Sequence, residues 1–122
     1  RGARAGGVVI VIDPRAAARG AVSAKPDRAA TALVHDTDDL RLLVFRLAPG
    51  QEVAPHRSPS TVTLTVLEGS GILVGEDGEA PVDRRCVAGD VVAYAPNELH
   101  GMRADAGELL LLAAITPRPG TR

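Results

Sequence analysis

The chain has almost no aromatic residues: of its 122 residues none is Trp, one is Phe and one is Tyr. Sites that bind sugars or nucleobases usually stack them on aromatic faces, so this composition argues against such ligands. The single cysteine, Cys86, excludes an internal disulfide and favours a reducing compartment, so we expect the cytoplasm. A lone cysteine on a strand is usually a small buried side chain, and we expect that role for Cys86.

The sequence also has no excess of charge of one sign and no long apolar run. Fourteen Lys and Arg residues oppose fifteen Asp and Glu residues, and no basic stripe is present, so we expect no nucleic-acid partner. The longest aliphatic runs, 8–12 and 109–115, are too short to cross a bilayer. No apolar segment with a cleavage site follows the Arg-rich beginning, so we expect neither a membrane partner nor a secretory signal.

Short apolar runs are what the sequence contains instead. They recur every eight to twelve residues between Gly, Pro, Asp and Asn, which is typical of an all-β sandwich or barrel in a single domain. The acidic residues of "GEDGE" (75–79) are expected in a solvated turn. The predicted strands are 8–12, 30–35, 41–48, 61–67, 71–75, 82–87, 91–95, 99–104 and 109–115.

The two ends of the chain differ from its middle. The only plausible helix, 14–21, spans one or two turns because it is short and contains Gly20. We therefore divide the chain into an N-terminal strand and arm (1–28) and a barrel (29–122). The tail 116–122 contains two prolines and is expected to end the fold as an extended strap.

The residue patterns of two strands predict which side chains point into the barrel and which surfaces of the barrel are covered. In 61–67, Val62, Leu64 and Val66 share one face and should point into the barrel, whereas three threonines share the other face. Strand 109–115 is apolar on both faces, so we expect the barrel interior on one side and a second sheet or subunit on the other. Together with 8–12 this is more aliphatic surface than a small barrel covers alone, which predicts a homodimer.

Residues 49–74 resemble the first motif of the cupin family. That motif consists of a glycine, five residues, His-x-His, three or four residues, a glutamate, six residues and a closing glycine. Gly50, His56 and Gly69 occupy their places in it. The resemblance implies a cupin double-stranded β-helix, that is, a jelly-roll barrel.

Residues 89–101 resemble the second cupin motif, which consists of a Gly-Asp turn, a strand, a proline turn and a histidine. The matching residues are Gly89, Asp90, Pro96 and His100. The two motifs occur in the family's order, and together the resemblance covers about residues 30–120.

The resemblance also implies where a metal would bind. Metal cupins use two histidines and a carboxylate from the first motif and one histidine from the second, a set suited to Fe, Mn, Ni or Zn. Here His56 and His100 occupy the first and last ligand positions, but Ser58 replaces the second histidine and Val62 the carboxylate. A slip of one residue would place Thr63 at the carboxylate position, but the strand alternation favours Val62.

We therefore expect His56 and His100 to face each other at one end of the barrel without a tight cofactor. At most a weakly bound divalent metal (Ni, Zn, Fe or Mn) is expected there, because two neutral ligands without an anion bind such ions poorly.

Three functions fit this pattern. The first is binding of a small molecule in a pocket formed by His56, Ser58, Val62, Leu64 and His100. The second is a cupin enzyme, either metal-dependent (dioxygenase, isomerase or decarboxylase type) through His56 and His100, or metal-free with a histidine as general base. The third is a structural or regulatory domain that acts through dimerisation. We favour small-molecule binding.

Overall fold

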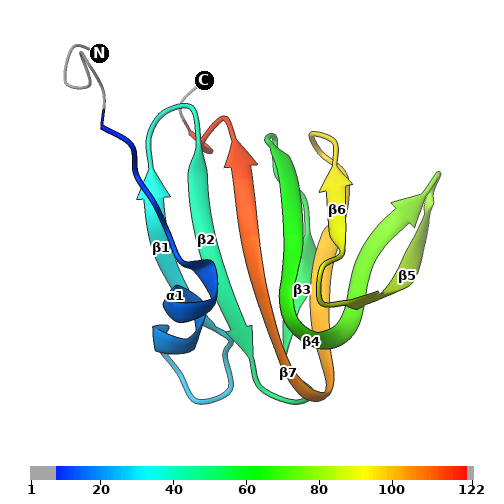
Figure 1. Ribbon diagram of the computed structural model, residues 1–122. Helices are drawn as coiled ribbons and strands as arrows, with labels where there is room; N and C mark the ends of the chain where they lie inside the picture. Colours follow the sequence, from blue (N-terminus) through cyan, green and yellow to red (C-terminus); the bar gives the residue numbers. More distant parts are fainter. Residues whose placement is uncertain (1–7, 121–122) are drawn as a thin grey trace.

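Antiparallel strands make up most of the protein, as the sequence predicts. The computed structural model describes residues 8–120 (Figure 1). The first seven residues of the predicted arm and the last two of the tail lie outside this range. The described elements are α1 (Pro14–Gly20), β1 (Ala30–Asp36), β2 (Arg41–Leu47), β3 (Glu52–His56), β4 (Thr61–Asp77), β5 (Ala80–Val87), β6 (Val91–Tyr94) and β7 (His100–Thr116).

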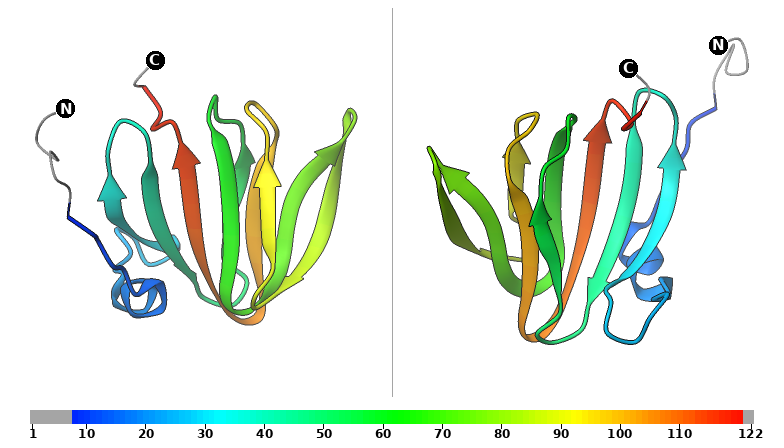
Figure 2. Two further views of the ribbon diagram at one scale, coloured as in Figure 1. Left: turned by 45° about the horizontal axis from the view of Figure 1, so that its top comes forward. Right: turned by 180° about the vertical axis from the view of Figure 1, so that it is seen from behind.

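The two longest strands, β4 and β7, belong to two sheets at once. Each has 17 residues, and they pair with each other along most of their length. The second half of β7 and the first half of β4 lie between β2 and β6, and β1 completes this first sheet at the β2 side. The first half of β7 and the second half of β4 lie between β3 and β5 in the second sheet. The bent strands thus produce the two facing sheets of a jelly roll (Figure 2).

Glycines allow this bend, and they explain why β4 was predicted as two strands, 61–67 and 71–75. Gly69 has a φ of +86°, and a Cβ atom added to it would lie 2.0 Å from the carbonyl oxygen of Glu108. A Cβ on Gly71 would lie 2.2 Å from the carbonyl oxygen of Arg103. These glycines let the two backbones approach closely at the bend. We had interpreted them as turn residues that end a strand, which is wrong.

Two other segments correct the predicted elements. Strand β3 was missed because its Pro55 indicates a turn. Among the described residues β3 pairs with β7 alone, and an edge strand tolerates proline. Residues 8–12, predicted as a strand, are not part of any strand in the structure. The helix predicted over 14–21 is confirmed as α1, with the Asp13 side chain capping its first turn.

The space between the sheets holds the main hydrophobic core. Val62, Leu64 and Val66 are buried in it, whereas the threonines of the same strand are partly exposed. The alternation predicted for 61–67 is thus confirmed. Cys86 is buried in the same core, where burial raises the pKa of its thiol. It is a small packed side chain, as predicted.

Helix α1 covers part of the outer face of the first sheet. Its Ala18 is completely buried against Val44, Leu67 and Leu110. Part of the outer face of the 109–115 strand is therefore covered by this helix, at Leu110, which the sequence analysis did not predict.

Two seams stay open between the sheets. Within residues 8–120 no strand pairing joins β1 to β3, or β5 to β6. The β4–β5 hairpin diverges from β6 (Figures 1 and 2), so the barrel is less closed than its name suggests. Grooves can therefore enter the interior from the sides.

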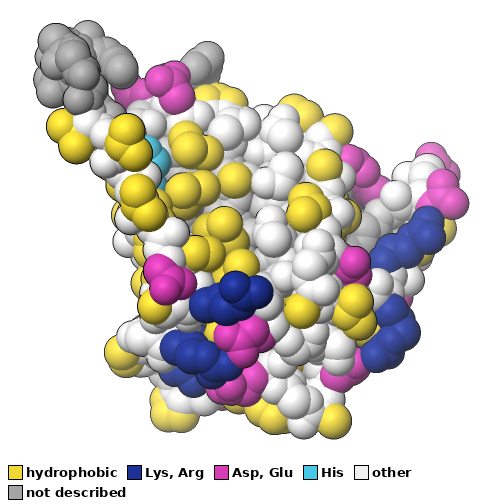
Figure 3. Space-filling model, in the orientation of Figure 1, with side chains coloured by type: hydrophobic (Ala, Val, Ile, Leu, Met, Phe, Trp, Pro, Cys, Tyr) yellow, Lys and Arg dark blue, Asp and Glu magenta, His cyan; other side chains and the backbone are white. Residues whose placement is uncertain are grey.

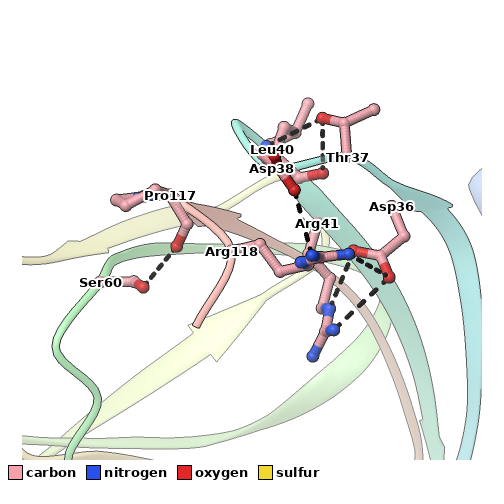
Figure 4. A network of polar contacts seen from close by, with 8 residues as sticks. All are labelled: Asp36, Thr37, Asp38, Leu40, Arg41, Ser60, Pro117 and Arg118. Atoms are coloured by element: carbon pink, nitrogen blue, oxygen red, sulfur yellow. Dashed lines mark hydrogen bonds and ion pairs between the residues drawn. The ribbon is translucent and has the colours of Figure 1, made fainter. Parts of the chain in front are cut away.

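The C-terminal tail crosses the turn between β1 and β2 (Figure 4). Arg118 forms ion pairs with Asp36 (3.4 Å) and Asp38 (3.1 Å), and the Ser60 hydroxyl donates a hydrogen bond to the carbonyl of Pro117. Hydrogen bonds from Arg41 are the main reason that the pKa of Asp36 lies below its ordinary value. Among the described residues, no helix has the length and apolar character needed to cross a membrane.

Candidate functional site

Two histidines from different strands meet at one end of the interior. His56 is the last residue of β3 and His100 is the first residue of β7, and the two are direct partners in the β3–β7 pairing. Their ring centroids lie 4.2 Å apart with an interplanar angle of 60°. His100 is buried with 7% exposure, whereas His56 is exposed at the mouth. The structure therefore brings together the two histidines that the motifs indicated.

Backbone carbonyls fix the tautomer of both rings. The Nδ1 atom of His56 lies 3.0 Å from the carbonyl oxygen of Ala54, and that of His100 lies 3.2 Å from the carbonyl oxygen of Glu98. A carbonyl only accepts hydrogen bonds, so Nδ1 is the donor in each ring. In the neutral form each Nε2 atom then keeps a free lone pair.

Burial lowers the pKa of His100 below its ordinary value of 6.5. A positive charge on neighbouring His56 lowers it further, and the hydrogen bond to Glu98 opposes the shift. His100 is therefore a neutral imidazole at neutral pH, with Nε2 as an acceptor.

A small cavity of about 100 Å³ lies beside the two rings, and we call it the histidine cavity. Apart from the histidines its walls are almost entirely apolar. The lining residues are Leu43, Phe45, Val53, His56, Val62, Leu64, His100, Gly101, Met102, Ala113 and Ile115.

Of the five predicted pocket residues, four line this cavity and Ser58 does not. The Ser58 hydroxyl accepts a hydrogen bond from the amide of Ser60 (3.2 Å), and its carbonyl accepts one from the amide of Asn97 (2.7 Å). Ser58 shapes the turn after His56, so its expected place in the pocket is corrected. Val62 lies in the cavity wall where a metal cupin would have its carboxylate.

Tyr94 forms a wall behind His100 that the sequence analysis missed. The two ring centroids lie 5.2 Å apart, and the tyrosine hydroxyl donates a hydrogen bond to the carbonyl of Val74 (2.9 Å). Burial raises the pKa of Tyr94 to about 12, so its hydroxyl stays protonated. The ring occupies the space beside Gly75, where a Cβ atom would lie 3.5 Å from it.

Glu76 joins the two segments that carry the histidines. Its carboxylate accepts two hydrogen bonds from Arg57 (2.8 and 3.1 Å) and one from the amide of Leu99 (2.9 Å). Arg57 directly follows His56, and Leu99 directly precedes His100. These contacts, chiefly the Arg57 hydrogen bonds, hold the pKa of Glu76 below its ordinary value. We had placed Glu76 in a solvated turn, which is wrong, because a partner from a distant loop is not visible in a local pattern.

The donor set at this site does not fit a firmly bound divalent metal. Within residues 8–120 no three His, Cys, Asp or Glu side chains are grouped closely enough to hold an ion. The nearby carboxylate of Glu76 is already occupied by Arg57 and Leu99. The site therefore offers two imidazole nitrogens and no free anion to balance a dication.

A larger groove borders the histidine cavity at the seam between β1 and β3. Its volume is about 530 Å³, and Phe45 and Val53 belong to the walls of both hollows. The rest of the groove is mixed in character and includes Asp27, Arg28 and Glu52. The apolar cavity and this more polar groove are thus direct neighbours.

Several solved structures are similar to this fold. A structure from Klebsiella pneumoniae with a double-stranded β-helix domain is 21% identical, with a TM-score of 0.75 over 90% of this chain and 91% of that chain. An RmlC-like cupin from Desulfovibrio desulfuricans is 30% identical, with a TM-score of 0.66 over 80% and 91%. An oxalate oxidase is 18% identical, with a TM-score of 0.72 over 85% and 59%.

A search of curated proteins finds no significant match. A family model described as "Cupin domain" matches residues 43–115, which is more than half of the sequence. The chain belongs to the cupin family.

Proposed function

We propose that the histidine cavity binds a small uncharged organic molecule that carries a hydrogen-bond donor. The observation that carries this proposal is the pair of rings whose Nδ1 atoms both face backbone carbonyls, which leaves Nε2 of each neutral ring as an acceptor. The remaining walls are apolar. A hydroxyl or amide N–H group would satisfy these acceptors, while the carbon skeleton of the ligand would contact the aliphatic side chains.

The volume of the cavity limits what enters it. Pockets for drug-sized ligands measure roughly 300–1,000 Å³, and the histidine cavity measures about 100 Å³. Either the ligand has only a few carbon atoms, or one end of a longer molecule enters the cavity. In the second case the rest of the molecule would lie in the adjoining groove past Phe45 and Val53.

We further propose that His56 and His100 hold a divalent ion at most weakly. Metal sites of this kind usually have three or four protein ligands, and Val62 places an aliphatic side chain where an anion would be needed. The second candidate, a metal-dependent cupin enzyme that uses His56 and His100, rests on their motif positions. The similarity to oxalate oxidase extends to the fold alone.

A matched pair of probes tests the binding proposal. 2-Butanol and butanone share a carbon skeleton, but only the alcohol donates a hydrogen bond. In amide-shift NMR titrations we expect 2-butanol to bind more tightly and to perturb the ends of β3 and β7 around His56 and His100. This preference should be lost in His100→Phe, which keeps an aromatic ring but removes the acceptor.

The control is His35→Phe, because His35 lies on β1 outside the histidine cavity. It should keep the preference for the alcohol. Equal affinities for the two probes, or a preference that survives in His100→Phe, would contradict the proposal. Stoichiometric metal retained through purification would favour the enzyme instead.

A further inference from the structure

A polar cavity of about 170 Å³ lies where the segment 22–29, which joins α1 to β1, meets the end of β2. Arg28 of this segment and Arg46 of β2 both line it, and we call it the arginine cavity. Within residues 8–120 no Asp or Glu belongs to its walls, and it shares no lining residue with the histidine cavity. Two cations thus line one hollow that is separate from the site described above.

The guanidinium of Arg46 lacks an acceptor on one edge. Its Nη2 atom donates a hydrogen bond to the carbonyl of Ala21 (2.9 Å), and its Nη1 atom donates one to the carboxylate of Glu108 (3.4 Å). Its Nε atom is buried, and within residues 8–120 it is the one buried side-chain nitrogen or oxygen without a hydrogen-bond partner. Because buried donors in folded proteins almost always have an acceptor, this atom indicates that a group is missing beside Arg46.

Arg28 presents a second guanidinium from a fixed turn. Its carbonyl lies 2.6 Å from the hydroxyl of Ser23 and 3.4 Å from the side-chain amide of Gln51, and its backbone amide donates to the carbonyl of Lys25 (3.0 Å). The Arg28 side chain itself forms no hydrogen bond or ion pair with any residue in the described part of the chain. The backbone is therefore held in place while the cation stays available.

The surrounding charges leave the arginine cavity positive. The carboxylate of Glu108 contacts Arg46 but also forms an ion pair with Arg19 (3.7 Å), so one negative charge serves two guanidiniums. Lys25 and Asp27 of the segment carry opposite charges, and neither lines the cavity. Lys and Arg side chains gather with acidic ones beside α1 in the lower left of Figure 3. The hollow keeps an excess of positive charge that an anion would balance.

We propose that the arginine cavity binds a phosphate group. Guanidinium groups donate pairs of parallel hydrogen bonds that match the oxygens of a phosphate, and two of them balance its double charge. The cavity is smaller than the roughly 300–1,000 Å³ of pockets for drug-sized ligands, so only a small anion or one end of a larger molecule fits. Arg28 also lines the larger groove beside the histidine cavity. The group can therefore be free phosphate or the end of an organic phosphate that continues into this groove.

Amide-shift NMR titration with inorganic phosphate, at an ionic strength held constant with chloride, tests the proposal. We expect saturable shifts in residues 22–28 and 46–51. Arg28→Gln should weaken phosphate binding roughly 10-fold, because it removes hydrogen bonds between charged groups. The fold should stay intact, since the Arg28 side chain is exposed and contributes no contact. The matched control is Arg84→Gln, at an exposed arginine of β5 outside the arginine cavity, and it should keep the affinity.

A second probe, propyl phosphate, distinguishes the two sources of the group. Tighter binding than inorganic phosphate, with added shifts at Phe45 and Val53 in the groove, would identify an organic phosphate. Equal affinity without those shifts would identify free phosphate. Three results would overturn the proposal: no saturable shift at millimolar phosphate, the same shifts with chloride alone, or an unchanged affinity in Arg28→Gln. Binding of 2-butanol beside His56 and His100 is measured separately, so failure here leaves that proposal standing.

Discussion

The interior between the two sheets has two ends that are built differently. At the end near the bend of β4 and β7, Leu47, Val66, Leu109 and Leu111 are fully buried and pack against one another. At the other end the same strands contribute the histidine cavity. The alternation of side chains is the same at both ends, so residue size makes the difference.

Small residues open the histidine end. Ala113 of β7 lies opposite Leu64, whereas two residues earlier Leu111 lies opposite Val66. Gly101 also lines the cavity, and a Cβ atom on it would lie 3.0 Å from the backbone of Pro55 in β3. One continuous strand pair thus lines a packed core and, a few residues further on, the histidine cavity.

Truncation at the packed end should have the largest effect. Leu111→Ala should lower the free energy of unfolding by about 2–5 kcal/mol, because a buried leucine leaves a cavity that neighbours fill only in part. Urea denaturation measures the loss. Leu33→Ala, at a half-exposed leucine, should change stability by less than about 0.5 kcal/mol. Equal losses in the two variants would mean that the packed end is not a core.

Enlarging one alanine at each end contrasts the two ends most directly. Ala104 and Ala113 are both buried in β7, but only Ala113 lines the histidine cavity. Ala104→Leu should destabilise the protein by about 1–3 kcal/mol through overpacking. Ala113→Leu should leave stability unchanged or higher, because it fills the cavity, and should abolish binding of 2-butanol. If Ala113→Leu destabilised the protein as much as Ala104→Leu, the histidine end would not be hollow.

Glu76 joins the two segments that carry His56 and His100, through Arg57 and Leu99. Removing its carboxylate should weaken ligand binding but leave the packed core at the other end intact. Glu76→Ala should reduce the affinity for 2-butanol by about 10-fold, since a residue that orients a site acts through its neighbours. Glu76→Gln should have a smaller effect, because its amide oxygen can still accept the Leu99 N–H. Glu79→Ala, an exposed glutamate three residues away, serves as the control. NMR titration measures the affinity of all three variants for 2-butanol. If Glu76→Ala and Glu79→Ala bound it equally well, Glu76 would have no role in positioning the histidines.

The smallest effect concerns pH. Burial lowers the pKa of His100 in the folded protein, so the unfolded chain binds a proton at this residue first as the pH falls below 6.5. Stability from neutral His100 is present above that pH and declines as the pH falls through 6.5 toward the folded pKa, by at most about 1.4 kcal/mol per pH unit. Melting temperatures of the unmodified protein should therefore fall more steeply with decreasing pH than those of His100→Phe. Parallel curves would mean that His100 is protonated equally in both states.

The sequence predicted the residues of the histidine end better than the bend of the strands at the packed end. The alternation in 61–67 and the two motif histidines predicted one cavity wall and the ring pair, because both depend on local spacing. The continuous β4 was not predicted, since Gly69 and Gly71 are typical of turns unless the opposing backbone is known. The role of Glu76 depends on contacts with Arg57 and Leu99, which are distant in the sequence and so not visible in a local pattern. Conversely, Ser58 is only two residues from His56 but takes part in a turn.

Calorimetric titration of the metal-free protein with Ni²⁺ or Zn²⁺ tests most directly whether the histidine end receives a ligand or a firmly bound metal. We predict no binding of sub-micromolar affinity, because His56 and His100 provide two nitrogens and no anion. Val62→Glu should raise the affinity, because it places a carboxylate in the cavity wall beside both rings. Ser58→His should not, because Ser58 lies outside the cavity. Sub-micromolar affinity in the unmodified protein, lost in His100→Phe, would contradict the account and favour the metal-dependent enzyme.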